Sequence, residues 1–306
     1  MQKPRLIKKI AQRPSFYTQH SERALYRNIT KRHEKVRAKN YPLIACVPSD
    51  ILGRWIVFNG LYEEELLISL FEKVFNHSDL QRFKQTTVID GGANVGNHSL
   101  FFSRYFKQVI SFEPNPNALK LLDTNIFLNK TKNIQVIPVG LSNETKILPF
   151  FDNKISLGAS AFIAENPLFE QQEPSQHLNV EKGDMLLEQH ILEHESITIS
   201  LIKLDVEWYE LKALQGLEKT ILKHQPIILF EANNSEGETG SKAVFNFLRQ
   251  HNYAYFYTIE QKKRHPFFLI RFIEKLKGYE IVLNQIQEPE DRRYPLIIAM
   301  TTELKF

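Results

Sequence analysis

The sequence predicts an α/β fold in which a doubly wound, mostly parallel sheet is covered by helices on both faces. From residue 86 onward, apolar stretches of strand length alternate with stretches whose apolar residues recur every three to four positions. The stretch ITISLIKLD, residues 197–205, is apolar almost throughout, which is typical of a strand buried on both faces. Such folds bind ligands beyond the carboxyl ends of their strands, so we expect the chemistry at that edge.

The predicted elements follow one another in the order strand, helix, strand. They are strands over residues 86–90, 108–113, 134–140, 197–205 and 226–232, helices over 97–106, 116–126, 211–221 and 243–251, and closing strands over 253–259 and 295–304. The second helix has the clearest start, because Asn115 can cap it and Pro116 stands where a first helical residue tolerates proline. Its Leu119, Leu122 and Ile126 share one face.

The chain is interpreted as one main domain, residues 51–306, preceded by a basic arm, residues 1–50. Residues 1–40 contain 12 Lys and Arg residues against two acids, Glu22 and Glu34. Their net charge is +10, and because the whole chain carries +4, the remainder carries −6. Such an arm either binds an anionic membrane surface or nucleic acid, or is a solvated helix.

Composition narrows the class of protein. Hydrophobic residues make up 42% of the chain and charged residues 24%, values that allow a sizeable core and argue against disorder. Cys46 is the only cysteine, which excludes an intramolecular disulfide and a cysteine-built metal site. No apolar stretch is long enough for a signal peptide or a membrane span, so we expect a cytoplasmic protein.

A glycine-rich turn follows the first predicted strand, in the stretch VIDGGANVGNHSLFF at residues 88–102. Its glycines let the backbone approach a ligand, and the helix after it offers free N–H groups. The spacing of Gly91, Gly92 and Gly96 does not fit the G-x-G-x-x-G of a dinucleotide loop, and Asp90 would repel a pyrophosphate. An aspartate would instead attract the ammonium and sulfonium groups of S-adenosylmethionine, directly or through water.

Glu113 ends the second predicted strand, 23 residues after Asp90, where an acid can accept hydrogen bonds from two ribose hydroxyls. An acid at this position can bind the ribose of a dinucleotide as well as the ribose of S-adenosylmethionine. Together with Asp90 and Asn94 it favours the methyl donor; the alternative is a glycine-rich turn beside a surface glutamate.

Four segments resemble the core signatures of the FkbM family of S-adenosylmethionine-dependent methyltransferases, in the same order and at similar separations. They are VIDGGANVGNHSLF, SFEPNPNAL, VGLSNE and LIKLDVEWYELKALQGL, and the resemblance spans residues 55–233. It implies a class I methyltransferase (Rossmann-like) fold with seven strands, the last antiparallel, and O-methylation of a sugar in a glycan, glycolipid or glycosylated product. The cofactor-binding residues it implies are Asp90, Gly91, Gly92, Ala93, Asn94, Gly96, Glu113, Pro114, Ser142 and Asp205.

The family resemblance says less about the residues that bind the methyl acceptor, because a fold does not fix a substrate. GLYEEEL, residues 60–66, resembles a Tyr-Glu pair upstream of the glycine loop in the family, so Tyr62 and Glu63 either close over the ligands or begin an acidic helix. After Asp-Val-Glu the family commonly has glycine and then a small residue or histidine, whereas this chain has Trp208 and Tyr209. Trp208 is expected either to stack on a sugar or to cover a helix start.

Three acids are candidates for the general base that removes the proton of the acceptor hydroxyl. Asp205 and Glu207 follow the fourth strand and Glu231 ends the fifth, so all three belong to the ligand edge. Asp205 could instead bind the methionine ammonium, and each acid could be a helix N-terminal charge. A magnesium site made by Asp205, Glu231 and Asn233 is the mechanistic alternative, which is not favoured.

The expected acceptor is a saccharide or a glycolipid. Nucleic acid is disfavoured because the chain lacks an Asn-Pro-Pro-Tyr motif for a flipped base, and a nicotinamide cofactor is disfavoured by the glycine spacing. The stretch KKRHPFFLIRFIEKLKGY, residues 262–279, combines an apolar helix face with six Lys and Arg residues. It is either a core helix or, with the arm, a surface for peripheral contact with an anionic membrane.

Overall fold

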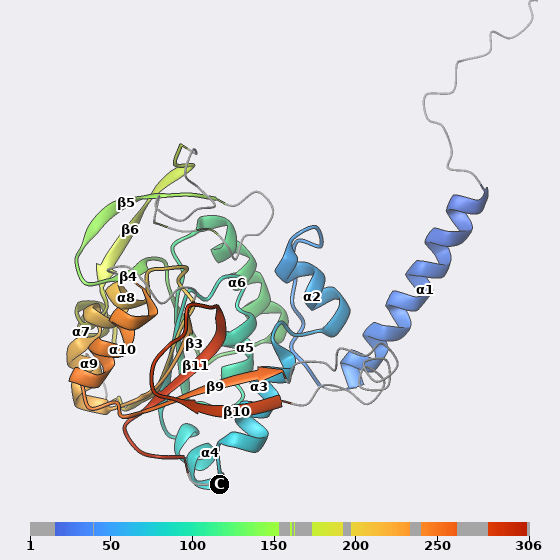
Figure 1. The fold of residues 1–306 in the computed structure, drawn as a ribbon. Coiled ribbons are helices and arrows are strands. Elements are labelled where there is room, and N and C mark those ends of the chain that lie inside the picture. The colour runs from blue at the N-terminus through green and yellow to red at the C-terminus, as the bar shows by residue number, and fades with distance from the viewer. Residues whose placement is uncertain are drawn as a thin grey trace, which may run out of the picture. The chain divides into compact units, whose positions relative to one another are not determined.

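The structure is a computed structural model that describes residues 16–38, 40–152, 160, 162, 173–191, 197–232, 240–261 and 281–304. The chain divides into two compact units, Met1–Tyr41 and Pro42–Phe306. In the first unit, α1 (Phe16–Ala38) is a helix of 23 residues, in agreement with the helical arm expected from the sequence (Figure 1). Residues 262–279, for which either a core helix or a membrane-facing surface was predicted, lie outside the described residues. No described helix is both long and apolar enough to cross a bilayer.

The second unit is organised around a sheet with the strand order β10-β9-β11-β8-β7-β1-β2-β3. Its strands are β1 (Thr87–Gly91), β2 (Gln108–Phe112), β3 (Ile134–Ile137), β7 (Ile199–Leu204), β8 (Ile227–Ala232), β9 (Tyr255–Gln261), β10 (Ile281–Ile286) and β11 (Tyr294–Met300). Strands β3, β2, β1, β7 and β8 are mutually parallel. Strand order reverses between β1 and β7, and such a switch point opens a crevice at the carboxyl ends of the strands.

The predicted doubly wound sheet is confirmed, including its antiparallel last strand, because β11 pairs antiparallel with both β8 and β9. The strand count is corrected: the described sheet has eight strands, since β10 adds an antiparallel edge next to β9. No residue of β10 is fully buried, and its apolar run is only three residues long, Ile281 to Leu283.

A second, three-stranded sheet, β4-β6-β5, was not predicted. It consists of β4 (Gly140–Ser142), β5 (Lys146–Phe150) and β6 (Gln176–Lys182). The strand predicted over residues 134–140 therefore divides into β3 and β4. Pro138 has no N–H for the ladder, and Val139 N donates to Ile137 O at 2.9 Å, which turns the chain away from the main sheet.

Helices cover both faces of the main sheet, with α7 to α10 grouped on one side and α5 and α6 on the other (Figure 1). The helices of this unit are α2 (Ile51–Asn59), α3 (Glu64–Ser69), the π-helical η1 (Leu70–Val74), α4 (His77–Phe83), α5 (Asn97–Phe102), α6 (Pro116–Asn129), α7 (Gly183–Ile191), α8 (Glu210–Gly216), α9 (Glu218–His224) and α10 (Ser241–Gln250). The start of α6 is as predicted, since the Asn115 side chain accepts a hydrogen bond from Asn117 N.

Candidate active site

The glycine-rich loop between β1 and α5 packs directly on the end of β7. Gly92 and Gly96 have φ values of +73° and +87°, and Asn94 also lies in the left-handed region at +49°. A Cβ atom on Gly92 would stand 1.9 Å from the carbonyl oxygen of Asp205. The N–H groups of Gly92 and Ala93 both donate to Phe112 O at 3.0 Å. The loop is therefore fixed between the ends of β2 and β7, at the switch point of the sheet.

Asp90 ends β1 inside the protein, with none of its surface exposed. Ser99 Oγ on α5 donates to Asp90 Oδ2 at 2.5 Å, and Lys203 Nζ forms an ion pair with Asp90 Oδ1 at 3.3 Å. The sequence predicted that this carboxylate attracts a cationic ligand. In the structure the buried ammonium of Lys203 already neutralises this carboxylate. Asp90 therefore stabilises the strand end from which the glycine loop begins.

Lys203 is a functional candidate that sequence reasoning missed. It lies on β7, whose residues are all buried, and its Nζ is 3.6 Å from Asp205 Oδ2 and donates to Gly92 O at 3.4 Å. Burial alone would lower the pKa of Lys203, but Asp90 and Asp205 raise it above its ordinary value, so the ammonium stays charged. Lys203 thus links the glycine loop to the acid that follows β7. The sequence signal was a single charge within a strand that is otherwise apolar.

Glu113 directly follows β2, and in the structure it lies against the glycine loop. Its Oε2 accepts a hydrogen bond from Asn94 N and its Oε1 accepts one from Asn115 N, both at 2.8 Å. Burial raises the pKa of Glu113 to about 7, although these two N–H groups lower it. The side-chain oxygen of Asn94 is buried and has no hydrogen-bond partner among the described residues. A buried acceptor without a donor suits a ligand that brings its own N–H or O–H group.

Three carboxylates meet where β7 and β8 end. Ligand oxygens of Asp205, Glu207 and Glu231 all lie within 4.8 Å of one another. Burial, followed by the charges of Asp205 and Glu210, raises the pKa of Glu207 to about 8. Burial, followed by Asp205 and Glu207, raises the pKa of Glu231 to about 9, even though Arg293 Nε donates to Glu231 Oε1 at 2.6 Å. The structure therefore brings together the three acids that the sequence proposed as bases.

Three carboxylates can lie this close together if a divalent ion binds all of them. They can also do so if protons and basic side chains reduce their charge. Of the predicted magnesium ligands, Asn233 lies outside the described residues. Asp205, Glu207 and Glu231 are close enough to share an ion. However, Lys203 pairs with Asp205, and Arg293 pairs with Glu231. The raised pKa of Glu207 means that a proton also reduces the charge of the cluster at neutral pH.

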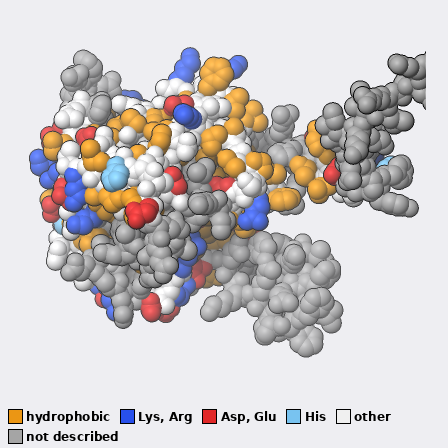
Figure 2. All heavy atoms as spheres, turned by 90° about the horizontal axis from the view of Figure 1, so that it is seen from above, with side chains coloured by type: hydrophobic (Ala, Val, Ile, Leu, Met, Phe, Trp, Pro, Cys, Tyr) orange, Lys and Arg blue, Asp and Glu red, His pale blue; other side chains and the backbone are white. Residues whose placement is uncertain are grey.

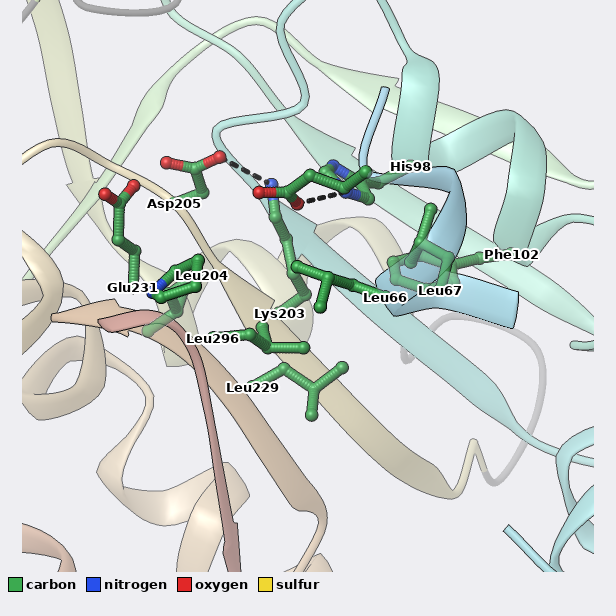
Figure 3. A pocket seen from close by; sticks show the side chains of 12 residues that line it. Leu66, Leu67, His98, Phe102, Lys203, Leu204, Asp205, Leu229, Glu231 and Leu296 are labelled. Carbon is green, nitrogen blue, oxygen red and sulfur yellow. Dashed lines mark hydrogen bonds and ion pairs between the residues drawn. The ribbon is translucent and has the colours of Figure 1, made fainter. Parts of the chain in front are cut away.

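The segment after α2 reaches the same edge of the sheet. Tyr62 N donates to Asn97 Oδ1 at 2.9 Å, and Asn97 Nδ2 donates to Tyr62 O at 3.0 Å, so α5 holds this segment in place. Glu63 Oε2 lies 3.2 Å from His98 Nε2. Glu63, His98, Lys203, Asp205 and Glu231 line a cavity of about 20 Å³, large enough for about one water molecule. Figure 3 shows the charged side chains grouped above its leucine-lined floor.

Ser142, which the family resemblance implies as a cofactor-binding residue, is fully buried, and its Oγ lies 3.2 Å from Tyr209 OH. Pro114 is half-buried in the chain that connects Glu113 with α6. Gly216 in α8 lies so close to β4 that a Cβ atom would stand 1.8 Å from Ser142 O. Ser142 is the last residue of β4, and Pro114 is the second residue after β2, so both lie at the carboxyl ends of strands.

Comparison with known proteins identifies the family. The family model described as Methyltransferase FkbM domain matches residues 90–255, which is more than half of the chain. The chain belongs to the FkbM methyltransferase family. The family predicted from the four sequence segments is thereby confirmed. Members use S-adenosylmethionine, the cofactor that the sequence predicted.

Curated relatives of this FkbM protein match over shorter stretches. Methyltransferase 1 of Beauveria bassiana (strain ARSEF 2860) is 25% identical over 146 residues, which cover 43% of this chain and 58% of the relative. Methyltransferase sdnD of Sordaria araneosa is 33% identical over 91 residues, which cover 28% of this chain and 34% of the relative. The chain thus spans between a third and three fifths of the length of these relatives. A solved structure of an FkbM methyltransferase from Methylobacillus flagellatus KT is 17% identical with a TM-score of 0.40, covering 89% of this chain and 59% of that chain.

The loop after β7 contains the main departure from the family pattern. Glu207 and Trp208 have φ values of +47° and +74°, so two consecutive residues with side chains adopt the left-handed conformation. This conformation explains why glycine is usual after Asp-Val-Glu, because a Cβ atom costs about 1 kcal/mol there. Trp208 remains partly exposed beside the carboxylate cluster. Strained residues of this kind concentrate at functional sites.

The FkbM assignment gives Glu113 a testable role. Replacing Glu113 with glutamine should weaken S-adenosylmethionine binding by about 1–2 kcal/mol, roughly 5- to 30-fold, because one acceptor oxygen becomes a donor facing donors. Isothermal titration calorimetry measures the effect, with thermal unfolding recorded in parallel. The matched control is Glu188→Gln on α7, where the side chain is 54% exposed. An affinity for Glu113→Gln equal to that of the control would exclude the ribose-binding role.

The buried acids also predict how stability depends on pH. Glu207 and Glu231 have folded-state pKa values of about 8 and about 9, above the ordinary value of 4.5. The folded protein therefore keeps protons that the unfolded chain releases, and stability falls as the pH rises from about 5 to 9. We expect the unfolding temperature to fall across this range, and less steeply in Glu231→Gln. If the unfolding temperature of Glu231→Gln falls with pH as steeply as that of wild type and of the control Glu188→Gln, Glu231 ionises normally.

Proposed function

We propose that this protein transfers the methyl group of S-adenosylmethionine to a hydroxyl oxygen, and that the hydroxyl belongs to a sugar in a glycan, glycolipid or glycosylated product. The observation that carries this proposal is the meeting of two features at one switch point: the glycine loop with Glu113, and the three carboxylates with raised pKa values. The first suits the methyl donor and the second suits an acceptor that must lose a proton.

The residues of the glycine loop fit the cofactor. S-adenosylmethionine supplies an electrophilic methyl group on a positively charged sulfur. Gly92 and Gly96 let the loop pack closely on Asp205 O and on Leu122, and the buried Asn94 oxygen is an acceptor in need of a donor. Glu113 presents carboxylate oxygens at the end of β2, where ribose hydroxyls would be bound. Acceptor and donor must be held close together, since methyl transfer requires an aligned oxygen, carbon and sulfur.

The carboxylate cluster is proposed to receive the proton. Methylation forms an O–C bond, breaks an S–C bond and releases the hydroxyl proton. Glu207 and Glu231 titrate at about 8 and about 9, so a carboxylate of this cluster is a stronger base than an exposed one. Because their carboxylates interact closely, the two acids titrate as a pair and share the role.

Trp208 supports a sugar acceptor. Its side chain is partly exposed next to Glu207, and an indole ring can cover the apolar face of a sugar. The strained backbone at Trp208 is consistent with a ring that is kept for binding.

A methyl-transfer assay tests the proposal. The protein is incubated with labelled S-adenosylmethionine and panels of saccharides, glycolipids and nucleic acids, and calorimetry compares S-adenosylmethionine with NAD and NADP. Labelled saccharide or glycolipid supports the proposal, whereas methylated nucleic acid alone, or binding of a nicotinamide cofactor alone, contradicts it. Loss of turnover with EDTA, restored by Mg²⁺, would favour the metal-assisted alternative.

The rate of this reaction should rise with pH. A base must be deprotonated to accept the hydroxyl proton, so we expect kcat to increase through about pH 8–9, following the pKa values of Glu207 and Glu231. The profile is measured at saturating concentrations of both substrates. A kcat that is already constant between pH 6 and 9 would mean that neither residue is the base.

A further inference from the structure

Six exposed apolar side chains lie on neighbouring elements outside the candidate active site, and we call them the apolar patch. The patch consists of Leu43, Val47, Ile51, Trp55, Phe127 and Leu128, from α2, the segment before it and the end of α6. Trp55 is 52% exposed and Phe127 is 80% exposed. Ile51 and Trp55 stand four residues apart on one face of α2. In Figure 2, hydrophobic side chains gather in the right-hand part of the domain. Grouped apolar exposure of this kind marks an interaction surface.

The backbone beneath the apolar patch is firmly attached. Asn129 on α6 accepts a hydrogen bond from Leu43 N at 2.8 Å and donates one to Leu43 O at 2.7 Å. Asn125, one turn earlier, makes the same pair of bonds with Ala45, at 2.6 and 3.1 Å. Gly53 of α2 packs so tightly on this segment that a Cβ atom would stand 1.9 Å from Val47 O. The patch is therefore a preformed surface that pays little ordering entropy on binding.

Cations surround the apolar patch. Arg54 is exposed next to Trp55, and Lys120, Lys130 and Lys132 are exposed on α6 and just beyond it. None of the four forms an ion pair within the part of the chain that the structure describes. Asp123 is the one acid of α6. An apolar centre with a cationic margin is complementary to a surface that is apolar inside and anionic outside.

We propose that the apolar patch docks on an anionic lipid surface. The aliphatic and aromatic side chains would enter the boundary between head groups and acyl chains, and the four cations would contact the anionic head groups. Trp55 suits this depth, because indole is enriched at membrane interfaces. A second copy of the chain fits less well. A two-fold interface brings the same surface of each copy together, so it would place the cations of one margin near those of the other.

The apolar patch lies close in the chain to the active site. If the proposed function holds, docking therefore bears on the acceptor. Helix α2 ends at Asn59, three residues before Tyr62, and the next residue, Glu63, lines the active-site cavity. Docking through α2 would hold the active site beside the head groups. The acceptor class that fits this arrangement is a saccharide attached to a lipid.

Trp55 is a built-in reporter for the experiment, because the chain has two tryptophans and Trp208→Phe leaves Trp55 alone. The full chain is mixed with vesicles of phosphatidylcholine with or without phosphatidylglycerol. We expect a blue shift of Trp55 emission, and quenching by brominated acyl chains, with the anionic vesicles at low salt only. Binding in cosedimentation should fall by about tenfold or more in Ile51→Asp/Trp55→Asp. The matched control, Met185→Asp/Leu222→Asp, changes two exposed apolar residues of α7 and α9 in the same way.

Three results would overturn the proposal. One is vesicle binding without a change in Trp55 emission, and another is equal binding by the patch variant and its control. The third is a concentration-dependent dimer, seen without lipid, that is lost in the patch variant. If that variant does not fold, Lys130→Glu/Lys132→Glu replaces it, and unchanged binding to anionic vesicles then contradicts the proposal. S-adenosylmethionine affinity, measured on each variant by calorimetry, separates failure of docking from failure of the proposed methyl transfer.

Discussion

Replacing Lys203 with methionine is expected to lower the free energy of unfolding by about 3–5 kcal/mol. Methionine matches the length of the lysine stem but leaves the carboxylate of Asp90 fully buried without its counter-ion. A charge that is desolvated and no longer paired costs far more than the ion pair contributed. Chemical denaturation with urea, read by far-ultraviolet circular dichroism, measures the change.

The control for this prediction is the charge-matched double variant Asp90→Asn/Lys203→Met. Asparagine is neutral and still offers an oxygen to Ser99 Oγ, so most of the lost stability should return. The double variant should nevertheless bind S-adenosylmethionine more weakly than wild type, because the link from Lys203 to Gly92 and Asp205 is gone. Equal destabilisation of the single and double variants would show that packing, and not charge pairing, is what Lys203 provides.

The central strands could be predicted from the sequence, whereas the edges could not. Every residue of β1, β7 and β8 is buried, and burial on both faces leaves an apolar run that can be recognised. The edge strand β10 and the small-sheet strand β6 are mostly only partly buried, so their sequences, IVLNQI and QHLNVEK, mix apolar with polar residues and have no long apolar run. Helix 211–221 was predicted as one element and is divided at Leu217, which follows the close contact of Gly216 with Ser142 O.

The acids of the candidate site could be predicted from the sequence one at a time. The ion pairs and hydrogen bonds that they form depend on the fold. The register of β1 and β7 places Asp90 directly beside Lys203, a relation between residues 113 positions apart that no local pattern reveals. Arg293 reaches Glu231 from the start of β11, 62 positions away. The sequence could place acids at the strand ends because strand ends are local features. Their charge states depend first on burial and then on charged partners brought by other strands, and together these decide which acids are neutral at pH 7.

Replacing Gly92 with alanine is expected to disrupt the site most directly. The new Cβ would lie 1.9 Å from Asp205 O, and a φ of +73° is unfavourable for alanine, so the loop must move away from the end of β7. Overpacking and backbone strain together should cost about 2–4 kcal/mol of stability. A shift of about 1 Å between cofactor and acids should also lower S-adenosylmethionine turnover by about a hundredfold.

The neighbouring Gly91→Ala is the matched control for this change. At Gly91 the added Cβ would meet side-chain atoms, at 2.7 Å from Leu204 Cδ2 and 3.0 Å from Leu141 Cδ1, and φ is not in the left-handed region. Side chains can rotate away where a backbone carbonyl next to a strand end cannot, so Gly91→Ala should be the milder variant in both unfolding and turnover assays. If the two variants lose stability and turnover equally, the contact between the loop and Asp205 O is not what positions the site. If Gly92→Ala alone loses turnover while both remain folded, the close approach of the glycine loop to β7 is what aligns the methyl donor with the carboxylate cluster.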